Sequence, residues 1–535
     1  MSIRPDRRQV LHLALAGGAA TVLPTLSYAG VTAFKQGVAE AASSDEDLAR
    51  FYRETNYAPI WTGENDAERR HAFLNALFLA DDHGLPSRRY TEEAFTNLFY
   101  GVESARSRGR AEVEASRLFL TYARDMQTGS ILNPETVDEG IVRALPRRDR
   151  VRLLQAIAGP NPQNTLRSLI PTNQRYNRLL KAKMQLERNL SVGGWGDTVR
   201  SNSLRPGDAG RSVIALRNRL IRMGYLSRST TATYDTALER AVQRFQSDHG
   251  LNADGSAGGA TLRAINVEPL ERLQSVIVGL ERERWINFEN GLGKRHVFVN
   301  IADFHVQIYD DDKVTFETRS VVGRSRIDKR TPEFSDVMEH MVINPTWYVP
   351  RSIATKEYLP NMQNNPGAHG YLELYDGSGR RVSRANVDFT QYTESNFPFD
   401  LRQPPSTRNA LGLVKFMFPN RHNIYLHDSP AKNLFDREVR TYSSGCVRLA
   451  KPFEFGYEIL SRQESDPVRA FHSVLDTGEE TYVYLDQHVP VHLTYRTAWA
   501  PIQGRTQYRD DIYGRDAALW SALSRSGVAL RAVQS

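Results

Sequence analysis

The chain has almost no cysteine, since Cys446 is the only one in 535 residues. A single thiol excludes an intramolecular disulfide, so packing alone must hold the fold together. Cys446 then has two interpretations, a small buried hydrophobe or a working nucleophile. The chain is long enough for roughly two to four hydrophobic cores.

Long apolar runs are also scarce, and none after the N-terminal region is long enough to cross a bilayer. Near the N-terminus, Arg7-Arg8 precede an apolar run from Val10 to Leu26, and small residues follow around Ala29. This order is typical of a twin-arginine signal peptide, which we assign to residues 1–30. Because histidine, glycine and proline interrupt the run, we expect cleavage or loose inner-membrane anchoring rather than a span. The sequence therefore predicts export to the periplasm.

The excess of basic over acidic residues raises the question whether the chain binds nucleic acid. The chain has 69 lysines and arginines and 62 acidic residues, for a formal net charge of +7. A basic excess can indicate nucleic-acid binding, but here the cations are spread along the chain and no nucleic-acid-binding motif accompanies them. We therefore expect no nucleic-acid partner, and the excess fits a protein that works near anionic envelope polymers.

Apolar residues recur at helical spacing through residues 31–200. In the stretches Glu46–Tyr52, His71–Leu79 and Glu112–Met126 they stand three and four positions apart. No cluster of acids, bases or metal ligands accompanies them. The pattern predicts a helical scaffold without chemistry of its own.

A smaller unit follows a stretch rich in glycine and serine between 191 and 208. Apolar stripes over 210–224 and 235–248 and a short helix at Ala260–Ile265 predict a three-helix module, which we assign to 204–268. A further amphipathic helix at 270–288 lies in the connecting segment 269–292, and we expect it to pack on the scaffold.

From residue 296 the pattern changes to alternation and β-branched runs, which predicts a mostly β domain over 295–500. A polar insertion at 351–404 is rich in proline, glycine and asparagine, and we expect a capping subdomain there. A C-terminal extension covers 501–535. The predicted fold class is therefore α+β multidomain. The expected strands are Val297–Ile301, Phe304–Tyr309, Val314–Val322, Met338–Ile343, Leu413–Phe418, Ile424–His427, Thr481–Leu485 and Val491–Thr497, with a main helix at Pro452–Arg462.

The residues around Cys446 could serve nucleophilic catalysis. A thiol reacts as thiolate, so a base must take its proton, and His427 at the end of an apolar strand is the best candidate. Gly445 would let backbone N–H groups approach an oxyanion, and Ser444 supplies a further donor. Arg448 would share a face with Cys446 in an extended segment, where it could bind a carboxylate or form a structural ion pair. Spacing alone leaves the role of the cysteine open.

The sequence motifs around Cys446 and His427 resemble those of a known enzyme family. His427-Asp428-Ser429-Pro430 and Ser443–Leu449 resemble the signature of the L,D-transpeptidase (YkuD-type) catalytic domain, and the likeness extends to Asn344–Pro350 and Asn409–Gly412. Many members of that family have histidine where this chain has Ser444, but the large YcbB-like branch has serine there. That branch also shows the same order of scaffold, peptidoglycan-binding module and catalytic domain with a capping insertion.

The three-helix module has a resemblance of its own. Leu216–Leu220, Ala241–Gln246, Gly250-Leu251 and Asp254-Gly255 resemble the peptidoglycan-binding domain. The alternative is a spacer that binds nothing.

The resemblance implies a two-step acyl transfer on the tetrapeptide stems of peptidoglycan, in which Cys446 attacks and His427 transfers protons. It implies 3→3 cross-links, with L,D-carboxypeptidase activity or an inactive peptidoglycan-binding adaptor as alternatives. No cofactor and no metal are implied, and we expect a monomer that carbapenems acylate. The implied oxyanion hole consists of the amides of Gly445 and Cys446, with Ser444 and Tyr425 as further donors. The residues expected to bind substrate or to orient His427 are Arg448, Tyr425, Asp428, Trp347 and Asn344, of which Trp347 is expected as a wall rather than as a stacking platform.

Overall fold

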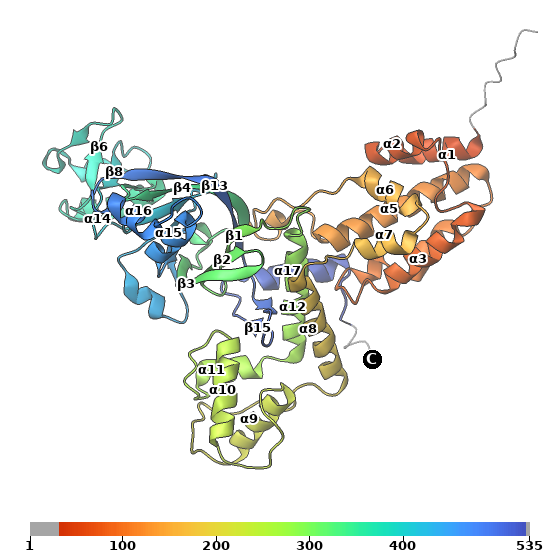
Figure 1. Cartoon of the computed structure of the whole chain (residues 1–535), viewed down its shortest axis with the longest axis horizontal. Coiled ribbons are helices and arrows are strands. Elements are labelled where there is room, and N and C mark those ends of the chain that lie inside the picture. The colour runs from red at the N-terminus through yellow and green to blue at the C-terminus, as the bar shows by residue number, and fades with distance from the viewer. Residues whose placement is uncertain (1–31, 531–535) are drawn as a thin grey trace, which may run out of the picture.

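The computed structural model describes residues 32–530, so the predicted signal peptide lies outside the described residues. Figure 1 shows the helices of the N-terminal region on one side of α12 (Pro269–Trp285) and the sheets on the other, with a three-helix unit at the end of α12. The predicted α+β multidomain class is confirmed. Over residues 32–530, none of the helices combines the length and the apolar character that a membrane span requires.

The N-terminal region is helical, as its periodicity predicts. Its longest helix begins after Ser104, whose hydroxyl accepts a hydrogen bond from the amide of Ser107, and ends at Gly129 with φ of +98°. Aromatic rings fill the core, with Phe73 in contact with Trp61, Phe95 and Phe119. The helices are α1 (Ala33–Ala42), α2 (Glu46–Glu54), α3 (Ala67–Phe78), α4 (Glu92–Thr96), α5 (Ala105–Thr128), α6 (Arg150–Ala158), α7 (Pro162–Ser168) and α8 (Gln174–Ser191).

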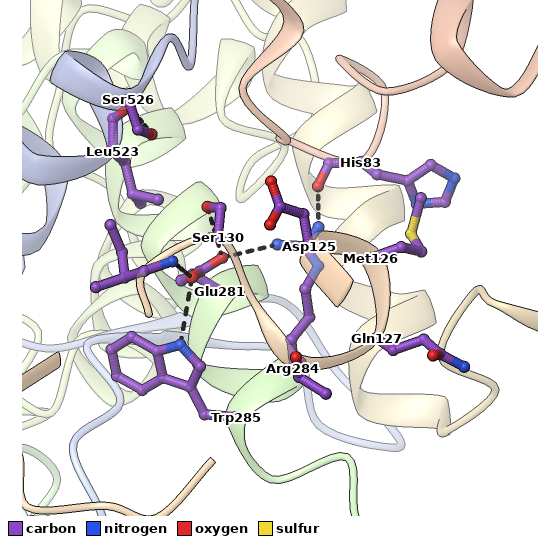
Figure 2. A network of polar contacts seen from close by, with 12 residues as sticks. His83, Asp125, Met126, Gln127, Ser130, Glu281, Arg284, Trp285, Leu523 and Ser526 are labelled. Atoms are coloured by element: carbon purple, nitrogen blue, oxygen red, sulfur yellow. Dashed lines mark hydrogen bonds and ion pairs between the residues drawn. The ribbon is translucent and has the colours of Figure 1, made fainter. Parts of the chain in front are cut away.

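Helix α12 is buried although it carries four consecutive charged residues at its C-terminal end, 281–284. The Glu281 carboxylate accepts hydrogen bonds from the Ile131 amide at 2.9 Å and the Trp285 indole at 3.3 Å, and it pairs with Arg284 at 3.3 Å. Figure 2 shows this network, in which Arg284 also reaches the carbonyl of His83. Because each buried charge is paired, the network fixes α12 against the loop that follows α5.

The three-helix unit consists of α9 (Arg211–Arg222), α10 (Thr236–Asp248) and α11 (Gly259–Asn266). Their apolar stripes share one core. A C-terminal hairpin of β14 (Ala498–Trp499) and β15 (Gln507–Tyr508) lies against the unit, where Tyr508 stacks on His249 at 5.5 Å.

The large sheet has the order β11-β3-β12-β10-β9-β4-β13-β1-β2, and a further pairing of β2 with β3 closes it. The two strands predicted at 481–485 and 491–497 are one strand, β13, and this prediction was wrong because a register shift between Tyr484 and Val489 breaks the sequence pattern without breaking the strand. The strands are β1 (Arg295–Asn300), β2 (His305–Asp310), β3 (Lys313–Gly323), β4 (Phe334–Ile343), β9 (Val414–Met417), β10 (Leu426–His427), β11 (Thr441–Ser443), β12 (Val447–Leu449) and β13 (Thr481–Thr494). Helices α15 (Pro452–Leu460) and α16 (Pro467–Leu475) pack on the sheet core.

The insertion forms a second sheet with its own apolar core. Its first strand precedes residue 351, because Trp347 pairs with Gln403. The buried side-chain amide of Asn409 donates to the carbonyls of Pro345, Gln403 and Pro404 at 3.0 Å each and so ties the two ends of the insertion together. The strands are β5 (Trp347–Tyr348), β6 (Glu373–Tyr375), β7 (Arg381–Val382) and β8 (Asp400–Gln403), with short helices α13 (Arg351–Ile353) and α14 (Leu359–Asn364).

The helical region also joins the large sheet directly. Ile141 forms a parallel bridge with Glu333, just before β4. The last helix, α17 (Arg515–Ser526), packs on α12 through Leu519 and Leu523. The active-site domain is therefore held by segments that precede and follow it in the sequence.

Candidate active site

The candidate site is built on the parallel pairing of β10 with β12, in which Leu426 faces Val447 and His427 faces Arg448. Leu426 and Val447 are fully buried in the sheet core. Since side chains alternate along a strand, Tyr425, His427, Cys446 and Arg448 share the opposite face. The structure therefore brings together the cysteine, the histidine and the arginine singled out in the sequence.

The turn that presents Cys446 depends on Ser443 and Gly445. Gly445 has φ of +125°, and a side chain there would meet Ile424 at 3.1 Å, so only glycine fits without strain. The Ser443 hydroxyl accepts from the Gly445 amide at 3.1 Å and donates to the Cys446 carbonyl at 2.6 Å. Ser444 is exposed beside them.

The predicted oxyanion hole involves the amides of Gly445 and Cys446. The Gly445 amide is engaged by Ser443, whereas the Cys446 amide has no acceptor among residues 32–530. The Gly445 N–H is thus engaged by Ser443, and the role of both amides in an oxyanion hole stays a prediction. The Cys446 N–H is available to a ligand.

Sequence reasoning missed Thr331, which holds the turn from behind. Its hydroxyl donates to the Gly445 carbonyl at 2.7 Å and accepts from the Gly323 amide at 2.9 Å. The Thr331 amide donates to the hydroxyl of Tyr513, and its carbonyl accepts from Arg515 at 3.1 Å. No local sequence pattern connects Thr331 with Tyr513 and Arg515, which lie more than 180 positions away.

Arg515 extends this support to the helical region. Its guanidinium is fully buried and pairs with Asp138 at 3.1 Å and with Glu333 at 3.4 Å. Asp138 lies in the segment between α5 and α6. A chain of contacts therefore runs from the helical region through Arg515 and Thr331 to Gly445.

The Cys446 thiol is half-buried and donates to the carbonyl of Asn423 at 3.5 Å. Burial raises the pKa of the Cys446 thiol to about 11, although the amide and hydroxyl of Tyr425 and the charge of Arg448 act in the opposite direction. The thiol is therefore protonated at neutral pH.

The His427 imidazole is neutral as well. Burial, and next the charge of Arg448, lowers the pKa of His427 to about 3. Its Nδ1 donates to the carbonyl of Asp428, and since a carbonyl only accepts, Nδ1 carries the proton and Nε2 is the basic atom. No hydrogen bond joins the imidazole to the sulfur of Cys446.

Asp428 orients His427 by its backbone and not by its carboxylate. The carboxylate accepts from the amides of Leu413 at 2.9 Å and Ser429 at 2.6 Å and pairs with Lys432 at 2.6 Å. The carboxylate therefore fixes the loops on either side of β10, while the carbonyl of Asp428 orients His427, one of the two roles expected for this residue. Substrate binding by Asp428 stays a prediction.

The sequence left two roles open for Arg448, carboxylate binding and a structural ion pair. Arg448 is half-buried, burial lowers its pKa, and it forms no ion pair within the described part of the chain. Its Nε atom is buried without a hydrogen-bond partner. The structural ion pair is therefore absent, and the guanidinium can receive an anion.

The remaining predicted residues differ in their placement. The Tyr425 hydroxyl lies beside Cys446 and Trp347, and burial raises the pKa of Tyr425 well above its ordinary value. Trp347 is 7% exposed and packs edge-on against Tyr358, and its role as a wall of the site stays a prediction. Asn344 is buried, and its amide donates to the carbonyl of Leu475 at 2.9 Å, which is a structural contact. Substrate binding by Asn344 stays a prediction.

Comparison with known proteins agrees with this geometry. A family profile described as "L,D-transpeptidase catalytic domain" matches residues 294–459. Profiles described as "Scaffold domain" and "Putative peptidoglycan binding domain" match residues 46–182 and 209–265.

Three individual proteins are similar to the chain. A Haemophilus influenzae protein named "Putative L,D-transpeptidase" is 33% identical over 247 residues, which cover 45% of this chain and 48% of that protein, so the match spans about half of the relative's length. The solved structure of an L,D-transpeptidase (residues 123–326) from Xylanimonas cellulosilytica is 14% identical and covers 56% of this chain and 100% of its own, with a TM-score of 0.17. The structure titled "Structure of the Ldtfm-avibactam carbamoyl enzyme" is 11% identical and covers 59% of this chain and 98% of its own, with a TM-score of 0.18.

The three profiles follow the order in which the helical region, the three-helix unit and the large sheet occur along the chain. Cys446 and His427 both fall inside the catalytic match. The chain therefore contains an L,D-transpeptidase catalytic domain, joined to a scaffold domain and a peptidoglycan-binding domain.

Proposed function

We propose that this chain forms 3→3 cross-links in peptidoglycan through an acyl-enzyme on Cys446. One observation carries the proposal: the only thiol of the chain is partly accessible and shares a strand face with His427 inside the catalytic match. A structural cysteine would need neither the glycine turn that presents it nor the histidine beside it.

In the first step the sulfur attacks the carbonyl that joins meso-diaminopimelate to the terminal D-alanine of a tetrapeptide stem. The new carbon–sulfur bond replaces the carbon–nitrogen bond, and the thiol proton passes through Nε2 of His427 to the departing amine of D-alanine. A thioester on Cys446 remains. The Cys446 amide, which has no acceptor within residues 32–530, is the donor best placed for the oxyanion.

In the second step the side-chain amine of a neighbouring stem attacks the thioester. An amide forms, the sulfur leaves, and the proton lost by the amine returns to the sulfur through His427. The thioester holds the energy of the broken amide bond, so the reaction consumes no nucleotide. Arg448, which forms no ion pair with any residue from 32 to 530, is the candidate to hold a carboxylate of the donor stem.

Proton transfer requires a change from the resting state. The thiol and the imidazole are both neutral, and no hydrogen bond joins them. We propose that the bound stem displaces the thiol from the Asn423 carbonyl toward Nε2, so that deprotonation accompanies attack. A protonated resting thiol would also be less prone to oxidation outside the cytoplasm.

The proposal extends to the compartment, the oligomeric state and the role of the three-helix unit. The chain would work as a monomer in the periplasm, reached through the predicted signal peptide, where its substrate lies. The three-helix unit would hold the enzyme on the sacculus, with a spacer role as the alternative.

Replacement of the nucleophile gives the first test. Cys446→Ala should abolish 3→3-linked dimers from purified tetrapeptide muropeptides, as measured by mass spectrometry, because no other residue can hold the thioester. Tyr442→Phe is the matched control, since this exposed tyrosine of β11 is outside the expected site and should be able to lose its hydroxyl with little effect. Undiminished dimer yield from Cys446→Ala would refute the proposal.

The protonation state gives a second test. In the substrate-free chain, alkylation of Cys446 by iodoacetamide should accelerate about tenfold per pH unit between about pH 6 and pH 9, because only thiolate reacts and the pKa is raised to about 11. His427→Gln should leave this profile unchanged. A rate that is already maximal near neutral pH would reveal a resting thiolate–imidazolium pair and contradict the neutral state.

The support behind the turn gives a third test. Thr331→Val removes the hydroxyl that holds Gly445 and should lower the rate of dimer formation about tenfold or more, at a cost in stability of about 1–3 kcal/mol. Thr331→Ser should restore the rate. Because Thr331 acts by positioning, iodoacetamide alkylation should change far less than dimer formation. A large rise in alkylation together with the loss of dimers would mean that the variant is merely unfolded, because unfolding removes the burial that raises the pKa of the Cys446 thiol.

A further inference from the structure

A cavity lies between the helical region and the large sheet, and no residue of the capping insertion lines it. Its volume is about 1260 Å³. It is lined by residues 45 and 47 before and within α2, by α5, by the segment 132–150 and, from the catalytic domain, by Arg421. In Figure 1 these helical elements lie across from the large sheet, with the connecting segment between them. We call this space the arginine cavity.

The lining of the arginine cavity has an excess of positive charge. Seven arginines face three carboxylates, a difference of four positive charges. A concave surface of one sign concentrates oppositely charged ligands. The arginines are Arg117, Arg124, Arg143, Arg147, Arg148, Arg150 and Arg421, and the acids are Asp45, Asp47 and Glu135.

Most of these arginines already have partners. Arg150 pairs with Asp45 at 2.6 Å, and Arg143 is buried with its guanidinium bonded to Ser335 and to backbone carbonyls. Arg147 and Arg421 differ, because both are exposed and neither forms an ion pair in the part of the chain between 32 and 530. One lies on each side of the cavity, so a ligand could bridge them.

Two short segments connect the walls of the arginine cavity with the residues around Cys446. Arg421 stands two residues before Asn423, whose carbonyl accepts from the Cys446 thiol. On the other wall, Ile141 pairs with Glu333, two residues from the Thr331 that holds Gly445. Neither Trp347 nor a residue of the capping insertion lines the cavity, so an extended ligand bound there would approach the sulfur along these two segments and not under the insertion.

We infer that the arginine cavity binds the acceptor strand, through carboxylates on its peptide stems. The inference rests on the proposed function, which requires two stems at one sulfur. The proposed function assigns a carboxylate of the donor stem to Arg448, and we assign the Asn423 side of Cys446 to the acceptor. The planar guanidinium matches a carboxylate in a two-bond geometry. A volume above the usual range of about 300–1,000 Å³ for small-molecule sites suits a polymer segment.

The test separates donor use from acceptor use in the full-length chain. Exchange of the terminal D-alanine of a tetrapeptide for a free D-amino acid needs only the donor stem. In the double variant Arg147→Glu/Arg421→Glu this exchange should stay within about twofold of wild type, while stem-to-stem dimer formation should fall about tenfold or more. The deficit should shrink at high salt, because charge repulsion causes it.

Two further variants complete the design. Arg147→Lys/Arg421→Lys keeps the charge and should retain most of the dimer formation. Arg53→Glu makes the same change at an exposed arginine of α2 that is outside the cavity and has no ion pair among the described residues, and it should have no effect. If wild type makes dimers and the double glutamate variant makes them equally fast, the acceptor site is refuted while the proposed function stands. If wild type performs neither exchange nor dimer formation, the proposed function fails and the acceptor site fails with it.

Discussion

The parallel pairing of β10 with β12 is the interaction on which the rest of the site depends. It anchors Leu426 and Val447 in the sheet core and thereby turns Tyr425, His427, Cys446 and Arg448 to one face. A register shift of one residue would send the thiol into the core and bring apolar side chains to the surface. The chemistry proposed for this protein is thus tied to the same burial that stabilises the sheet.

The turn that presents the thiol is held from outside the sheet as well. Thr331 fixes the Gly445 carbonyl, and the fully buried Arg515 fixes Thr331 while it pairs with Asp138 of the helical region. Removal of one partner from such a buried pair leaves an unpaired charge, which is strongly unfavourable. The helical region therefore belongs to the support of the active site, and it also forms one wall of the arginine cavity.

The spacing of apolar residues predicted helices and strands, because these elements depend on residues close together in the sequence. Helical periodicity found α5 and α12, and strand alternation placed Arg448 on the face of Cys446. The hydrogen bonds among Thr331, Tyr513 and Arg515 join residues far apart in sequence. The spacing of apolar residues therefore could not predict them. The engagement of the Gly445 amide depends on a serine rotamer, and the burial of Asn344 depends on where α16 ends, so neither could be predicted from spacing.

The most direct measurement of the central claim is the mass of the intact chain after incubation with a carbapenem, followed by peptide mapping. A reactive thiol in a pocket shaped for a peptide carbonyl should give one covalent adduct per chain, located on the peptide that contains Cys446. An unmodified chain, or an adduct on a residue other than Cys446, would contradict the account.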